Sequence, residues 1–202
     1  MPINDTAVKK ILFQPFERFA GVQALSAGLV IALLAAIGAA LFQTRFDGVL
    51  DAHFALSGVS FETVIADQAV NLISLFAVFY GLAVILGARG MRPVDMFGTL
   101  AAARAPYVLI PLCNIGGFMS SRVNDVAAGI EADPLNPNLE PLLGMLPVLL
   151  FTLTVLVWMV ALSFNAWKVC TGFKGFRLIG GFIGAFILAE AFSVITIYFL
   201  NI

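Results

Sequence analysis

Five long apolar segments constrain this chain more than any other feature of its sequence. They cover residues 22–42, 69–88, 97–119, 142–164 and 178–200. A helix needs about 20 apolar residues to cross a hydrocarbon core about 30 Å thick, and each segment is long enough. Strands of a membrane barrel alternate polar and apolar residues over about ten positions, whereas these segments are continuously apolar. The pattern therefore predicts an all-α fold, an integral membrane bundle of five helices.

The composition agrees with a membrane environment. Hydrophobic residues make up 61% of the 202 residues and charged residues 11%, whereas a soluble domain is about 45–50% apolar and about 25% charged. So few charges cannot cover a surface that faces water, so the lipid bilayer is the expected main partner, and residues 1–202 are expected to form a single transmembrane domain. No basic run suggests nucleic acid binding. Cys113 and Cys170 lie apart in the predicted topology, so no disulfide is expected.

The distribution of basic residues predicts the orientation. Lys and Arg are retained on the cytoplasmic side during membrane insertion. Of the eleven basic residues, nine fall before the first segment, after the second or fourth, or near the inner end of the third: Lys9, Lys10, Arg18, Arg89, Arg92, Arg104, Lys168, Lys174 and Arg177. The two acidic connections, 43–68 and 120–141, hold only Arg45 and Arg122. We therefore expect a cytoplasmic N-terminus and an exoplasmic C-terminus.

Residues 5–20 are expected to form an amphipathic helix in the inner headgroup layer. Apolar side chains share one helical face there: Val8, Ile11, Leu12, Phe16 and Phe19. This pattern is typical of an interfacial helix, which Pro15 would kink or divide. The helix could be an anchor that orients the first span, or it could sense curvature or bind a partner.

Glu190 is the most unusual residue, because it lies well inside the fifth apolar segment. A carboxylate there is costly unless it is paired or protonated, and intramembrane acids are candidate functional sites. We expect Glu190 to face the protein interior in its neutral form, with Asn114 and Thr152 as hydrogen-bond partners. The alternative is a proton or cation site.

Arg104 and two prolines make the third segment irregular. Arg104 is expected to extend back to the cytoplasmic headgroups, since its stem is apolar; the alternatives are a reach toward Glu190 and a polar seam with Asn165. Pro106 and Pro111 each remove a backbone donor and should kink the helix. Broken helices also build transporter sites, but two prolines favour a kink that shapes the bundle.

Small residues in the fifth segment predict close helix packing. Gly180, Gly181 and Gly184 give GxxxG-type spacing, which lets two helix backbones approach closely. Packing inside the bundle is the favoured interpretation, and homodimerisation through this face is the alternative.

The segment DGVLDAH contains Asp47, Asp51 and His53, the only histidine. These residue types can bind metals, but three of them in an exposed acidic loop are weak evidence, because real sites need supporting residues. No metal site and no cofactor is predicted from the sequence. No motif of a known catalytic class lies in a suitable context.

Three stretches resemble the Ypt-interacting protein (Yip) domain family of small five-span membrane proteins. They are ILGARGMRPVDMFGTLAAARAPYVLIPL at 85–112, WMVALSFNAWKVCTGFKGFRLIGGFIGAFIL at 158–188, and FQPFERF before the first span. The resemblance implies roles in membrane organisation, vesicle traffic and scaffolding, without catalysis. It is closest to prokaryotic members, which implies the bacterial cytoplasmic membrane. Eukaryotic members contact Rab-type GTPases with a long cytosolic N-terminal region that this sequence lacks, so the resemblance does not extend to a GTPase partner.

The sequence therefore favours a membrane-organising or partner-binding scaffold, with a homodimer or another membrane protein as its partner, and not an enzyme. The alternative is a small transporter or channel, with a site formed by Glu190, Asn114 and the proline-broken third span. A cavity that reaches Glu190 would support transport, and a filled bundle would count against it.

Overall fold

The computed structural model describes residues 10–56, 58–135 and 140–200. Within these described residues, five helical stretches are long and apolar enough to cross a membrane, in agreement with the five predicted spans. They are α2 (Gly21–Leu41), α3 (Phe61–Ile85), a broken stretch from Pro93 to Ala132, α6 (Glu140–Thr171) and α7 (Gly175–Leu200). The fold is therefore all-α and consistent with a multi-pass membrane protein.

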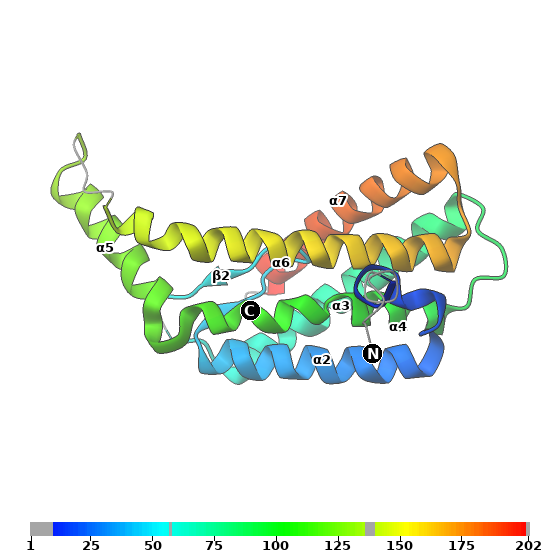
Figure 1. The fold of residues 1–202 in the computed structure, drawn as a ribbon, viewed down its shortest axis with the longest axis horizontal. Helices are drawn as coiled ribbons and strands as arrows, with labels where there is room; N and C mark the ends of the chain where they lie inside the picture. The colour runs from blue at the N-terminus through cyan, green and yellow to red at the C-terminus, as the bar shows by residue number, and fades with distance from the viewer. Residues whose placement is uncertain (1–9, 57, 136–139, 201–202) are drawn as a thin grey trace, which may run out of the picture.

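The helices pack in a bundle in which neighbours in space are not always neighbours in sequence. In Figure 1, α2 and the long α6 lie on either side of α4 (Pro93–Ala103), and α3 and α7 cross behind them. The most extensive contacts join α2 to α4 and α3 to α7, followed by α4 to α6. α4 therefore lies at the centre of the bundle, and seven of its eleven residues are buried.

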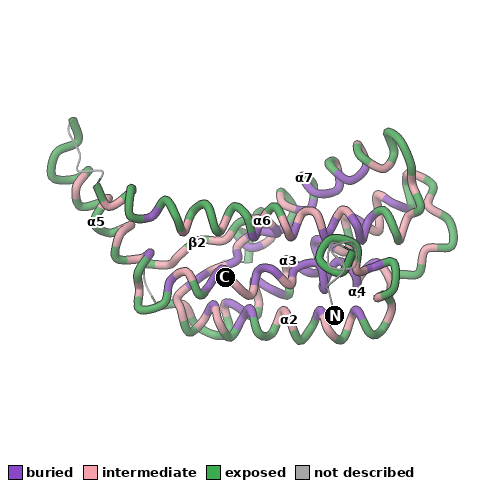
Figure 2. The backbone as a smooth tube through the Cα atoms, viewed as in Figure 1, coloured by how far each residue is buried: buried purple, intermediate pink, exposed green. Residues whose placement is uncertain are grey.

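Buried and exposed residues divide the helices into inner and outer faces (Figure 2). The outer faces of α2 and α7 carry large apolar side chains that are more than 40% exposed, including Leu29, Val30, Leu34, Ile183, Ile187 and Leu188. Apolar patches of this extent are not stable against water, and they match a lipid-facing surface. The inner faces meet in one core that includes Phe79, Met96, Met159 and Trp167.

Several boundaries differ from the predicted ones because polar residues near the helix ends are paired. α3 begins at Phe61, eight residues before the predicted span, because Ser60 caps its first turn by accepting from the Thr63 N–H. Asp67, expected in the preceding loop, is buried inside α3 and forms an ion pair with Arg45 (2.9 Å). α6 likewise continues beyond the predicted 142–164, to Thr171.

The predicted interfacial helix at 5–20 is only partly within the described residues, because residues 1–9 lie outside them. Residues 10–13 are helical, and a short 3-10 helix, η1 (Pro15–Glu17), follows. Pro15 therefore divides this segment. Phe16 is buried, and its N–H donates to Asn165 Oδ1 of α6 (3.3 Å).

The third span is divided into four pieces. α4 is followed by the 3-10 helices η2 (Ala105–Leu109) and η3 (Pro111–Gly117), and then by α5 (Phe118–Ala132), which projects from the end of the bundle (Figure 1). Pro106 and Pro111 lie in the first turns of η2 and η3. A proline lacks the N–H that would continue an α-helix, and its missing donor costs least in a first turn.

Candidate functional site

A β-hairpin between α2 and α3 folds back onto the bundle. Its strands, β1 (Thr44–Arg45) and β2 (His53–Phe54), pair antiparallel. The connecting residues 46–52 form the hairpin tip, in which Phe46 and Val49 are fully buried (0% exposed). Two apolar side chains thus draw a non-helical backbone segment into the bundle, where its N–H and C=O groups need partners.

The peptide group between Val49 and Leu50 lies between two ionisable side chains. Its C=O accepts from Arg104 Nη1 (2.9 Å), and its N–H donates to Glu190 Oε2 (2.6 Å). Arg104 comes from the broken third span and Glu190 from α7. The positive guanidinium therefore faces the oxygen end of the peptide dipole, and the Glu190 carboxyl group accepts at the N–H end. Both side chains favour this orientation of the loop.

Two hydroxyl groups complete the contacts on the same two residues. The Val49 N–H donates to Ser193 Oγ (3.1 Å), and the Leu50 C=O accepts from Tyr107 Oη (3.1 Å). Each backbone polar group of Val49 and Leu50 thus has a side-chain partner. We call Arg104, Tyr107, Glu190 and Ser193 the loop-binding cluster.

Neighbouring contacts extend this arrangement. Asn71 of α3 is fully buried, and its Nδ2 donates to the Phe46 C=O. Gly48 lies directly against the cluster, because a Cβ built at this position would be 2.5 Å from Glu190 Oε1. A side chain at position 48 would therefore have to displace the Glu190 carboxyl group, which is held by the Leu50 N–H.

The structure corrects the predicted surroundings of Arg104. Its side chain does not extend to the headgroups, since the residue is 2% exposed, and it does not pair with Asn165, which accepts from Phe16. Its guanidinium lies 4.8 Å from the Tyr107 ring centroid and is attracted by the Glu190 carboxylate. The bond to Val49 explains the difference, because the hairpin tip supplies an acceptor that the sequence did not reveal.

The predicted partners of Glu190 are also wrong. Asn114 instead donates to the Phe42 C=O (2.7 Å), and its Oδ1 accepts from the Met119 and Ser120 N–H groups (2.9 and 3.0 Å). It therefore caps the start of α5, after a turn in which Gly116 and Gly117 adopt positive φ (66° and 73°). Thr152 lies beside Cys113. The Leu50 N–H takes the place that these two residues were expected to fill.

The glycines of α7 differ in how closely they pack. A Cβ at Gly181 would be 2.8 Å from Leu86 and 3.0 Å from Trp167, so this glycine is required inside the bundle. A Cβ at Gly184 would have only Leu82 nearby, at 3.9 Å, and one at Gly180 would meet Phe176 of its own helix at 3.1 Å. The close approach predicted for this face therefore occurs at Gly181.

A closer crossing joins α2 and α4, and the sequence analysis did not identify it. A Cβ at Gly28 would be 2.5 Å from the Ala101 Cβ, and a Cβ at Gly98 would be 2.7 Å from the Gly21 oxygen. Two glycines facing opposite helices allow this contact. The sequence did not indicate this crossing, because the two glycines are isolated and lie 70 residues apart.

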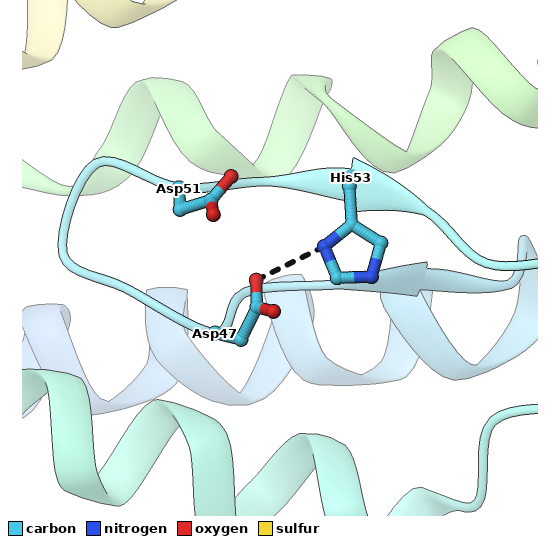
Figure 3. A group of neighbouring side chains, drawn as sticks. All are labelled: Asp47, Asp51 and His53. Atoms are coloured by element: carbon cyan, nitrogen blue, oxygen red, sulfur yellow. Dashed lines mark hydrogen bonds and ion pairs between the residues drawn. The ribbon is translucent and has the colours of Figure 1, made fainter. Parts of the chain in front are cut away.

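The outer side of the hairpin carries a second group of charges. His53 Nδ1 and Asp47 Oδ1 lie 3.0 Å apart (Figure 3). This hydrogen bond raises the pKa of His53 above its ordinary value and lowers the pKa of Asp47. The hydrogen bonds with Asp67 likewise raise the pKa of Arg45. The hairpin is thus held by the buried contacts of its tip and by the ion pairs of Arg45 and His53.

In comparisons with known proteins, the chain matches no family model, no curated protein and no solved structure. The function must therefore be inferred from the geometry of the chain itself.

Proposed function

We propose that this chain is a membrane-organising or partner-binding scaffold without catalytic activity. The observation that supports it is the use made of the polar side chains in the broken third span and α7. Arg104, Tyr107, Glu190 and Ser193 all bind the backbone of the chain's own hairpin tip. These four contacts hold the hairpin tip in one shape, as a binding surface requires. They also leave the four side chains bound to the backbone of the chain itself.

The proposed orientation places the hairpin on the exoplasmic side of a bacterial cytoplasmic membrane. With Arg104 set aside as buried, eight of the eleven basic residues lie in the other connections and two, Arg45 and Arg122, lie on the hairpin side. This asymmetry supports a cytoplasmic N-terminus. The resemblance to prokaryotic Yip proteins supports the same membrane and the same class of function.

Single cysteines test the orientation. Cysteines at Asn4, Asp133 and Ile202 in a variant without Cys113 and Cys170 would be exposed to an impermeant thiol reagent in intact cells. We expect labelling at Asp133 and Ile202 and protection at Asn4 until the cells are opened. Labelling at Asn4 but not at Asp133 would reverse the orientation.

Site-specific photocrosslinking in native membranes tests the scaffold proposal. A photoreactive residue at Leu56, 58% exposed on the hairpin side, should give a discrete adduct with a partner protein. The matched control is Ile187, 64% exposed on α7, where lipid is the expected neighbour. Absence of a discrete protein adduct at Leu56 would contradict a scaffold that acts through this surface. An adduct of two copies at Ile187 would show the homodimer.

Transport is the second candidate. The observation that favours it is the broken third span, whose Arg104 is attracted by Glu190. Glu190→Gln separates the two functions. The amide oxygen can still accept from the Leu50 N–H, so a purely structural Glu190 should tolerate Gln with little loss of thermal stability. A proton or cation site would lose its function with Gln while stability is unchanged.

Glu190→Leu removes the acceptor and should lower stability by about 1–2 kcal/mol, because intramembrane hydrogen bonds are modest. Thermal unfolding of the two variants in detergent measures both effects. If Gln is as damaging as Leu, the structural role is wrong.

A further inference from the structure

Metal-ligand side chains converge on the outer side of the hairpin. Asp47, Asp51 and His53 each offer one ligand atom, and these atoms lie within 4.8 Å of one another. Figure 3 shows the three side chains facing a common space between the two sides of the hairpin. The sequence spacing alone predicted no site here, since the convergence depends on how the hairpin tip folds.

The convergence places like charges together. Among the described residues, Asp51 has no hydrogen bond or ion pair, yet its carboxylate faces that of Asp47. The Glu190 carboxyl group lies near this turn, because a Cβ built at Gly48 would be 2.5 Å from Glu190 Oε1 and 3.0 Å from the Asp51 Cβ. Arg45 is ion-paired with Asp67 and also attracts Asp47, and Arg104 binds Val49 and is attracted by Glu190, so Asp51 is the carboxylate left without an ion pair among the described residues. Converging carboxylates repel one another, and a bound cation would remove that cost.

A buried polar atom without a partner belongs to a side chain that binds the backbone of the same turn. Asn71 is fully buried, and among the described residues its Oδ1 has no hydrogen-bond partner. Its Nδ2 holds the C=O of Phe46, the residue before Asp47. A buried oxygen without a donor costs about 1–3 kcal/mol. A donor at this turn, such as a water molecule, would satisfy this oxygen.

The donor set indicates the class of ion. An imidazole together with two carboxylates suits first-row transition ions such as Zn²⁺, whereas Ca²⁺ and Mg²⁺ prefer oxygen ligands alone. The backbone between Asp47 and Asp51 is held by the loop-binding cluster, so these two ligands are positioned before an ion arrives. We propose that Asp47, Asp51 and His53 form a binding site for a divalent transition-metal ion that closes the outer side of the hairpin.

Zn²⁺ titration of the purified chain tests this proposal. The full chain, carrying an affinity tag without histidine, is treated with chelator, placed in lipid nanodiscs and titrated calorimetrically. We expect one Zn²⁺ per chain. Asp47→Asn, Asp51→Asn and His53→Gln should each weaken binding by about tenfold or more, since even supporting residues of a metal site have effects of that size. Glu131→Gln, which removes an exposed carboxylate of α5, is the matched control and should leave the affinity unchanged.

Asp51→Asn is the decisive variant, because Asp51 is exposed and its loss breaks no hydrogen bond of the fold. Its melting temperature in the presence of chelator should be no lower than that of the unchanged chain, because the substitution removes only a repelling charge. Co²⁺ provides a second readout, with a visible spectrum of nitrogen and oxygen ligation and no thiolate charge-transfer band. The proposal is overturned if the unchanged chain binds no Zn²⁺, or if all three substitutions leave the affinity as it was. It does not rest on the scaffold function, which the photocrosslinking tests separately.

Discussion

The two acidic connections on the hairpin side of the bundle have similar compositions but different structures. The connection between α2 and α3 folds into a hairpin whose tip is bound by side chains of the spans. The connection from the third span to α6 continues as α5 and projects from the bundle (Figure 1). Phe46 and Val49 are fully buried, whereas Met119 is the only buried residue of α5. A similar charge content therefore does not decide whether a connection enters the bundle; apolar residues of the connection and polar partners in the neighbouring helices do.

Arg104→Met should have the largest effect, because it removes the donor to the Val49 C=O and the cation beside Glu190. Removing one member of a buried charged network costs about 3 kcal/mol. The matched change in the other acidic connection is Arg122→Met, which should stay within about 0.5 kcal/mol, as surface substitutions do. Thermal unfolding in detergent measures both. Equal effects would mean that the two connections do not differ as described.

Substitution of one glycine in each connection should have opposite signs. Gly48→Ala places a Cβ against Glu190 Oε1 and should destabilise by about 1–3 kcal/mol. Gly129→Ala, inside α5, should stabilise by up to about 1 kcal/mol, because alanine has the higher helix propensity. The two melting temperatures, compared with that of the unchanged chain, report the signs directly. A stabilising Gly48→Ala would show that the hairpin tip is not seated on Glu190.

The ion pair on the outer side of the hairpin should make a small contribution that depends on pH. The pKa of His53 is raised from its ordinary 6.5. The stability that His53 contributes is therefore fully present below pH 6.5, and it is lost as pH rises through the raised pKa of the folded protein. The pKa of Asp47 is lowered from its ordinary 3.8. The stability that Asp47 contributes is therefore present above pH 3.8, and it is lost only as pH falls through the lowered pKa of the folded protein. Because both groups are partly exposed, the contribution is at most about 1 kcal/mol.

Melting temperatures between pH 6 and pH 9, with chelator present, measure this contribution. The unchanged chain should lose stability as pH rises, and His53→Gln should remove that part of the slope. If the two pH profiles are parallel, the pair does not stabilise the hairpin. α5 provides the comparison, since Glu131→Gln should leave the pH profile unchanged.

The five spans could be predicted because a helix in lipid is defined locally, by some twenty consecutive apolar residues. The loop-binding cluster could not, since its contacts join residues far apart, such as Leu50 and Glu190, 140 positions apart. The sequence did provide one usable signal. Glu190 and Arg104 are polar residues inside apolar segments that must find partners, and both belong to the cluster. Asn71, Tyr107 and Ser193 carried the same signal more weakly, and the sequence analysis did not select them.

Thiol labelling at matched positions tests the central claim most directly, which is that the hairpin tip is buried in the bundle while the other acidic connection is exposed. Val49→Cys and Asp133→Cys, each in a chain without Cys113 and Cys170, are reacted with a polar maleimide in lipid nanodiscs. Val49 is fully buried and Asp133 is exposed. We predict rapid labelling at position 133 and protection at position 49, with both sites labelled after denaturation. Equal labelling rates in the folded protein would contradict the account.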